Sequence, residues 1–213
     1  MERFIKRIDK KTAKTKIEPH FHKYIKREYH DIYETEPVSF LKWNRFDIAL
    51  KLFFDMKDKN PNLAERIYAE HIRAFSIGKF IEPGNEAKNS INIYIDDFDK
   101  LYKSILCNGF DEGKTLIPSS RKNTKINGAH RVASTIKVEE RIKYINIDAD
   151  DPVYNYTYFY NRNVNSDILD MITIKFIEYA KNVHIAFFWP VEGEVAIDIE
   201  KLIPNIIYRK IFF

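Results

Sequence analysis

The chain has 213 residues, of which 45% are hydrophobic and 15% aromatic, which excludes a disordered protein and allows one domain with a substantial core. Its single cysteine, Cys107, excludes an intrachain disulfide, and no apolar run is long enough to span a bilayer, so we expect a cytoplasmic protein. The net charge of +4 is unevenly placed, because residues 1–30 hold ten Lys/Arg and four Asp/Glu. We interpret this basic segment as a solvated N-terminus. The alternative is contact with nucleic acid or an anionic membrane.

The first third of the chain predicts a helical region. Residues 1–36 are polar, lysine-rich and weakly periodic, which predicts some helix and irregular structure ending before Pro37. Apolar residues at helical spacing predict an amphipathic helix from Phe40 to about Lys57. Asn60-Pro61 and Gly78 indicate the start and end of the next helix. We therefore expect residues 1–78 to form a basic, helical N-terminal region.

The middle of the chain, residues 79–150, predicts a small mixed sheet with helices. Asp96 or Asp97 can cap a helix that Asn108-Gly109 closes. The expected strands are Lys79–Glu86, which breaks into a Pro-Gly turn, then Thr115–Pro118 paired with Thr124–Ile126 across a Ser119–Asn123 turn, and finally Arg141–Ile147.

Residues 151–213 predict a further α/β sector. Four tyrosines at 154–160 indicate a loop whose rings pack in a core or interface, with base stacking as the alternative. The expected elements are a helix at 167–181, a buried strand at 183–189, a helix at 197–203 and a final strand at 206–213. We expect this sector either to pack on the core or to continue in a longer protein.

The segment Ile126–Ala133 carries the strongest chemical signal. It predicts the end of a strand, a hinge at Gly128 with a positive φ, and a helix that opens with His130 and Arg131. Unpaired backbone N–H groups and two side-chain donors meet there, which favours an anion such as a nucleotide phosphate. Neither of the common glycine-rich phosphate loops occurs in the chain.

The order of elements over residues 80–147, with its G-x-H-R box, resembles the ParB/sulfiredoxin-like nucleotide-binding superfamily. The resemblance implies an α+β fold with a small mixed sheet. Sulfiredoxin-like proteins carry a catalytic cysteine inside the box, where this chain has Ala129, so that activity is excluded. The chromosome-partition branch has a G-E-R-R box and a downstream helix-turn-helix, which match this chain less well.

The free serine kinase branch is the most similar. Its members pair the G-x-H-R box with an upstream Pro-x-x-Glu whose glutamate is the general base, and Pro83-Gly84-Asn85-Glu86 stands at the corresponding place. The resemblance implies a phosphotransferase that uses ATP or a related nucleotide with Mg²⁺ and acts on the hydroxyl of an amino acid, polyol or sugar. Glu86 would be the catalytic base. The phosphate-binding residues would be Gly128, Ala129, His130 and Arg131, joined by Ser119 and Ser120. The metal ligands stay unassigned, because Asn127 replaces an aspartate common in the family.

Each of these residues has a simpler interpretation. Arg131 can form a salt bridge on the first helical turn, His130 can be a capping or core residue, and Glu86 can be an exposed loop residue. Ser119, Ser120 and Arg121 can form a plain hairpin turn. His20, His22 and His30 are interpreted as a solvated segment and not a metal site, whereas Asp148, Asp150 and Asp151 offer carboxylates for magnesium or a substrate amine.

The alternative function is a ParB-like nucleotide-binding module that regulates or contacts DNA without kinase activity, although nucleic acid is not the expected partner. The chain is also similar to uncharacterised proteins of bacterial or viral surface-polysaccharide pathways, which favours a sugar or sugar phosphate as the acceptor.

Overall fold

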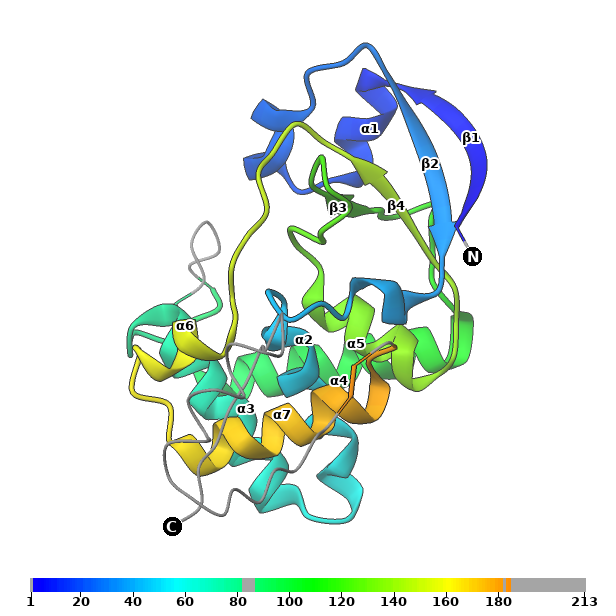
Figure 1. Cartoon of the computed structure of the whole chain (residues 1–213). Helices are drawn as coiled ribbons and strands as arrows, with labels where there is room; N and C mark the ends of the chain where they lie inside the picture. Colours follow the sequence, from blue (N-terminus) through cyan, green and yellow to red (C-terminus); the bar gives the residue numbers. More distant parts are fainter. Residues whose placement is uncertain (1, 82–86, 182, 185–213) are drawn as a thin grey trace. The chain divides into compact units, whose positions relative to one another are not determined.

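The computed structural model describes residues 2–81, 87–181 and 183–184 (Figure 1). Residues 1–181 form one compact unit. The fold is α+β, as the sequence predicted: a four-stranded mixed sheet is combined with helices that make up most of the remaining structure. No helix in the described part of the chain is both long and apolar enough to cross a membrane.

The sheet has the strand order β1-β2-β4-β3. Its strands are β1 (Arg3–Asp9), β2 (Tyr29–Thr35), β3 (Ile117–Ser119) and β4 (Ile142–Asn146). The pairs β1–β2 and β2–β4 are antiparallel, whereas β3 and β4 are parallel. Parallel neighbours need a crossover connection, and here helix α5 (Ala129–Lys137) provides it.

The segment between β1 and β2, residues 10–28, packs against the sheet. Helix α1 (Lys10–Lys16) begins after Asp9, whose side chain accepts a hydrogen bond from the backbone N–H of Thr12. The 3-10 helix η1 (Pro19–Tyr24) follows, and η2 (Pro37–Phe40) comes directly after β2. One core cluster joins this segment to the strands and contains Ala13, Ile17, Ile25, Ile32, Leu116, Ile145, Ile147 and Ala149.

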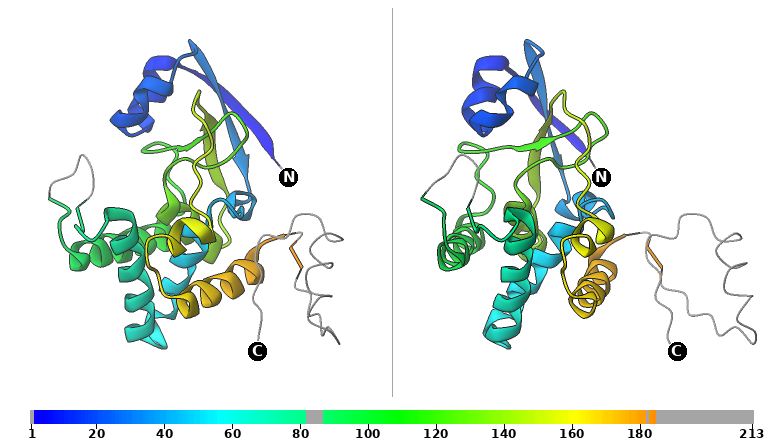
Figure 2. Two further views of the ribbon diagram at one scale, coloured as in Figure 1. Left: turned by 60° about the vertical axis from the view of Figure 1, so that its left-hand side comes forward. Right: turned by 90° about the vertical axis from the view of Figure 1, so that its left-hand side faces the viewer.

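The remaining helices form a second layer, visible from further sides in Figure 2. They are α2 (Phe46–Leu52), the 3-10 helix η3 (Phe53–Asp58), α3 (Pro61–Ser76), α4 (Ile91–Asn108), α6 (Tyr156–Tyr160) and α7 (Ser166–Tyr179). Helix α2 packs against α3, α5 and α7, and α4 packs against α5. Two helices of this layer, α2 and α4, therefore pack against α5, the helix that carries the G-x-H-R box.

Several sequence-based expectations for the elements are confirmed. Helix α3 starts at Asn60-Pro61, where the Asn60 side chain accepts a hydrogen bond from the Leu63 N–H, and it ends before Gly78. Gly109 closes α4, α7 matches the expected 167–181 helix closely, and β4 matches the expected strand at 141–147. The expected strand pair forms only in part: the first strand is Ile117–Ser119, and the 124–126 segment contributes one isolated antiparallel bridge, between Ser119 and Lys125.

Other expectations are wrong. Residues 1–36 contain two strands as well as helix, and β2 pairs directly with β4, so no boundary near residue 78 separates the N-terminal region from the sheet. The sequence of β1 lacks the alternation of apolar and polar residues that indicates a strand. β1 is an edge strand in which no side chain is fully buried, so lysines and arginines are tolerated on it. The expected 40–57 helix is divided among η2, α2 and η3, and the 154–160 loop contains α6.

Helix α4 begins at Ile91, so Asp96 and Asp97 lie inside it and not at its cap. Apolar side chains at Tyr94 and Phe98 continue the helical stripe across this acidic pair. Residues 79–81 are not a strand. The rest of that expected strand, including Pro83 and Glu86, lies outside the described residues, as do most of the elements expected after residue 182.

Candidate functional site

The hinge predicted at Gly128 is present. Gly128 has a φ of 82° and caps the amino end of α5. A Cβ at this position would lie 2.7 Å from Cδ1 of Ile117 and 2.8 Å from Nη2 of Arg131, so a side chain is excluded both by the backbone conformation and by space. Ala129 follows as the first helical residue and is buried. The corner is therefore closely packed in this structure.

Arg131 makes an ion pair across the corner. Its Nη2 lies 2.5 Å from Oε1 of Glu18, in the loop between α1 and η1, and its Nη1 hydrogen-bonds to Oγ1 of Thr115. The Arg131 side chain is 11% exposed. A carboxylate of the chain itself therefore pairs with the guanidinium group that we expected to bind phosphate.

His130 faces the helical layer. Its Nε2 lies 2.8 Å from the hydroxyl of Tyr68 on α3, and its ring centroid lies 4.7 Å from that of Phe98 on α4. Burial, reinforced by the nearby Lys51 cation, holds the pKa of His130 well below its usual value. The imidazole is therefore neutral at pH 7 and packs as a partly buried histidine between two helices.

The turn after β3 holds its own residues in place. Ser119 and Ser120 are fully buried. The Ser120 hydroxyl accepts hydrogen bonds from the N–H groups of Lys122 and Thr124 and contacts Asp151, which is the pattern of a structural turn. Among the described residues, Oγ of Ser119 has no hydrogen-bond partner.

The carboxylates considered for magnesium are engaged by cations. Arg121 lies 3.0 Å from Asp148 and 2.7 Å from Asp150, and Lys26 lies 2.7 Å from Asp148. Within the described residues no group of three or more His, Cys, Asp or Glu side chains is placed to hold a metal ion. Of the three histidines predicted to lie in a solvated segment, His20 is exposed, and Nε2 of His22 lies 2.9 Å from the Ile17 carbonyl oxygen. The prediction is wrong for His30, which is 4% exposed because β2 places it inside the sheet.

A cluster of charged residues that the sequence did not single out lies beside the amino end of α5. We call it the cationic cluster and define it as Arg45, Asp47, Lys51, His71 and Lys125. Each member is at most 4% exposed. The cluster joins the start of α2, the middle of α3 and the segment that leads into the Gly128 hinge.

Arg45 and Asp47 form its centre. Nε and Nη2 of Arg45 bind the two carboxylate oxygens of Asp47 at 2.8 and 2.7 Å, and Nη1 of Arg45 hydrogen-bonds to the backbone carbonyl of Lys125. Burial opposes ionisation of Asp47, but Arg45 outweighs it and holds the pKa of Asp47 well below its usual value. Asp47 is therefore ionised and already neutralised by Arg45.

Two lysines lie beside this neutral ion pair, and burial disfavours the charged form of both. Nζ of Lys51 lies 2.6 Å from Nε2 of His71 and 3.7 Å from Asp47, and burial lowers the pKa of Lys51 to about 8. Nζ of Lys125 is buried with no hydrogen-bond partner among the described residues, and burial holds the pKa of Lys125 well below its usual value. Arg131 also acts electrostatically on Lys125, which places the cluster next to the G-x-H-R corner. Within the described ranges, three basic side chains thus share one carboxylate.

The sequence carried little signal for this cluster. Lys125 precedes the hinge by three residues and stands among the polar residues Asn123, Thr124 and Asn127, so its burial was not indicated by the sequence. Asp47 and Lys51 are spaced i,i+4 on α2, a pattern that is usually a solvated ion pair. Glu18 and Tyr68 lie 113 and 62 residues from their partners in the box, and such contacts are not visible in a sequence.

Comparison with known proteins gives no match: no protein family, curated protein or solved structure matches the chain.

Proposed function

We propose that the chain binds the phosphates of a nucleotide, ATP being the first candidate, at the cationic cluster and the amino end of α5, and transfers a phosphoryl group to the hydroxyl of a small molecule. The observation that carries the proposal is the excess of buried basic side chains over carboxylates. Arg45, Lys51 and Lys125 are 2%, 4% and 0% exposed and have one carboxylate between them among the described residues. Buried cations are costly unless an anion pairs with them, and a polyphosphate supplies several negative charges at once.

The amino end of α5 adds donors to the same place. The first amides of a helix lack intrahelical partners and carry a partial positive charge, so they attract phosphate. The φ of 82° at Gly128 starts α5 directly after the Lys125–Asn127 segment. In this proposal the helix end and Nζ of Lys125, which has no hydrogen-bond partner among the described residues, act on one bound anion.

Glu18 is the internal competitor in this proposal. Its carboxylate pairs with Arg131 as a phosphate oxygen would. Binding of nucleotide would exchange Glu18 for phosphate at Arg131. Replacing Glu18→Gln removes the competing charge, and we expect it to tighten ATP binding about tenfold, in line with the usual strength of a hydrogen-bonded ion pair.

The transfer step needs a base, for which we propose Glu86. It would take the proton from the acceptor hydroxyl while the hydroxyl oxygen forms a bond to the terminal phosphorus. The bond from that phosphorus to its bridging oxygen breaks, and a nucleoside diphosphate leaves. Mg²⁺ would accompany the phosphates and share their charge. A neutral His130 and the cationic Arg131 belong to the site as positioning groups.

Calorimetric titration with ATP and Mg²⁺, followed by assays of ADP formation with serine, glycerol and sugars, tests this proposal. The native chain should bind ATP, and Lys125→Met should weaken binding at least tenfold. The exposed neighbour Lys122→Met serves as the control and should leave it unchanged. Glu86→Gln should keep binding and lose turnover. Absence of ATP binding, or full binding by Lys125→Met, contradicts the proposal.

Binding without ADP formation for any acceptor would favour the regulatory module over the kinase. The structure offers little support for DNA contact through the basic N-terminus, because several of its cations already pair with carboxylates. Arg3 lies 3.0 Å from Glu34, and Arg7 lies 2.7 Å from Asp31.

A further inference from the structure

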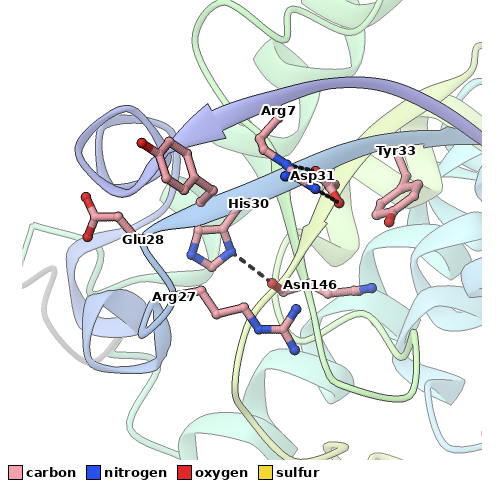
Figure 3. A pocket seen from close by; sticks show the side chains of 8 residues that line it. Arg7, Arg27, Glu28, His30, Asp31, Tyr33 and Asn146 are labelled. Atoms are coloured by element: carbon pink, nitrogen blue, oxygen red, sulfur yellow. Dashed lines mark hydrogen bonds and ion pairs between the residues drawn. The ribbon is translucent and has the colours of Figure 1, made fainter.

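A second candidate site lies on the sheet, away from the residues of the cationic cluster. Its cavity has a volume of about 360 Å³ (Figure 3). The residues that line it are Arg7 of β1, Arg27 and Glu28 before β2, Tyr29, His30, Asp31 and Tyr33 of β2, and Asn146 at the end of β4. This volume is at the lower end of the range for small-molecule sites, so it suits a ligand of few atoms. No sequence motif indicated it.

The cavity is lined by a buried imidazole in which one nitrogen has no hydrogen-bond partner among the described residues. His30 is 4% exposed, and its Nδ1 lies 3.2 Å from the backbone carbonyl oxygen of Asn146. A carbonyl oxygen only accepts hydrogen bonds, so Nδ1 carries a proton, and Nε2 is the nitrogen that can accept a hydrogen bond. Among the described residues, Nε2 of His30 has no partner.

A second acceptor is also unused. Oδ1 of Asn146 is buried and has no hydrogen-bond partner in the described part of the chain. Buried polar atoms are nearly always paired, and leaving one unpaired costs about 1–3 kcal/mol. The two residues that carry these atoms both line the cavity, which favours a ligand that brings hydrogen-bond donors, such as hydroxyl groups.

The same cavity holds one cation that interacts with the carboxylates of Asp31 and Asp148 through electrostatics alone. Arg7 is engaged by Asp31 through two hydrogen bonds of 2.7 and 3.3 Å. Arg27 makes no hydrogen bond or salt bridge with another described residue, and Figure 3 shows its side chain at the cavity together with His30 and Asn146. Arginine is suited to carboxylate and phosphate, because its planar group donates two parallel hydrogen bonds.

We propose that this cavity binds a small organic anion that carries a hydroxyl next to its carboxylate or phosphate. The anionic group pairs with Arg27, the hydroxyl donates to Nε2 of His30, and a further hydroxyl donates to Oδ1 of Asn146. The site does not depend on the phosphotransfer proposed above, because it shares no residue with the cationic cluster.

Four probes separate the two kinds of contact in an NMR or calorimetric titration. Glycerate and glycerol 3-phosphate carry both groups, glycerol carries hydroxyls alone, and inorganic phosphate carries charge alone. We expect at least one of the first two to bind ten times more tightly than glycerol and phosphate, and the better of the two identifies the anion. Equal binding of all four, or no binding, overturns the proposal.

Variants assign the contacts. Arg27→Gln should weaken the anionic probe at least tenfold, and Arg66→Gln, an exposed arginine on α3, is the matched control that should leave it unchanged. His30→Phe should lower the affinity to that of phosphate. If His30→Phe does not fold, Asn146→Ala provides the corresponding measurement with a smaller change. Full affinity in Arg27→Gln contradicts the assignment.

Discussion

Lys125 has a buried Nζ for which the described residues supply no partner. In the proposed site this arrangement serves anion binding at the expense of stability. Lys125→Met keeps the length and removes the polar group, so we expect the ligand-free protein to gain about 2 kcal/mol, the typical cost of an uncompensated buried polar group. Urea denaturation at pH 7 measures the change.

The neighbour Lys122→Met is the control for that experiment. Its side chain is exposed, so its free energy of unfolding should stay within about 0.5 kcal/mol of the native value. A loss of stability in Lys125→Met would show that Lys125 makes structural contacts, and the lysine would then have no reason to be assigned to a ligand.

Lys51 gives the proposed site a pH dependence. Burial lowers the pKa of Lys51 to about 8 despite the opposing effect of Asp47, so the side chain loses its charge as the pH rises through 8. We expect ATP affinity to fall about tenfold between pH 7 and pH 9. The stability of the free protein should change in the opposite direction, because the unfolded chain, in which Lys51 has its usual higher pKa, binds more protons over this range.

Lys51→Arg separates this effect from other titrations. Arginine keeps its charge at pH 9, so ATP affinity in this variant should vary much less between the two pH values. Calorimetric titrations at pH 7 and pH 9 test both proteins. An unchanged pH dependence in Lys51→Arg would assign the effect to another group.

Helix α5 depends on its first turn. Gly128→Ala adds a Cβ to a residue whose φ is positive, and this Cβ would lie 2.7 Å from Cδ1 of Ile117. The backbone conformation alone costs about 1–2 kcal/mol, and the clash adds a similar amount. We expect a loss of about 2–4 kcal/mol in the free energy of unfolding, measured by urea denaturation.

Gly78→Ala is the matched control. Gly78 also has a positive φ, 78°, but a Cβ there would meet no atom within 4 Å. Gly78→Ala should therefore lower the free energy of unfolding only by the cost of the backbone conformation, about 1–2 kcal/mol. Equal losses in the two variants would mean that Ile117 moves aside and that the corner is less closely packed than the structure shows.

The elements that the sequence predicted are those with local signals. Asn60-Pro61 and Gly78 bound α3, and Gly128 begins α5, because caps and hinges depend on neighbouring residues alone. The pattern failed for β1, an edge strand whose charged side chains face solvent on both sides. In the candidate site, the hinge was predictable, but the partners of Arg131 and His130 were not, because Glu18 and Tyr68 come from distant parts of the chain.

The sheet unites segments that the sequence assigned to different regions. β2 contributes Ile32 to the core together with Leu116 and Ile145, so the N-terminal strands and the β3-α5-β4 unit bury the same cluster. We therefore expect them to unfold together.

Ile32 is 1% exposed, and Ile32→Ala should lower the free energy of unfolding by about 2–5 kcal/mol. Hydrogen exchange should show this loss equally at amides of β2, β4 and α5, since residues 1–181 form one compact unit. Phe4→Ala, at a side chain that is 56% exposed, should leave exchange in α5 unchanged. Slow exchange persisting in α5 of Ile32→Ala would show that the helical layer is stable without the N-terminal strands, and Glu18 would then belong to a separable cover over Arg131.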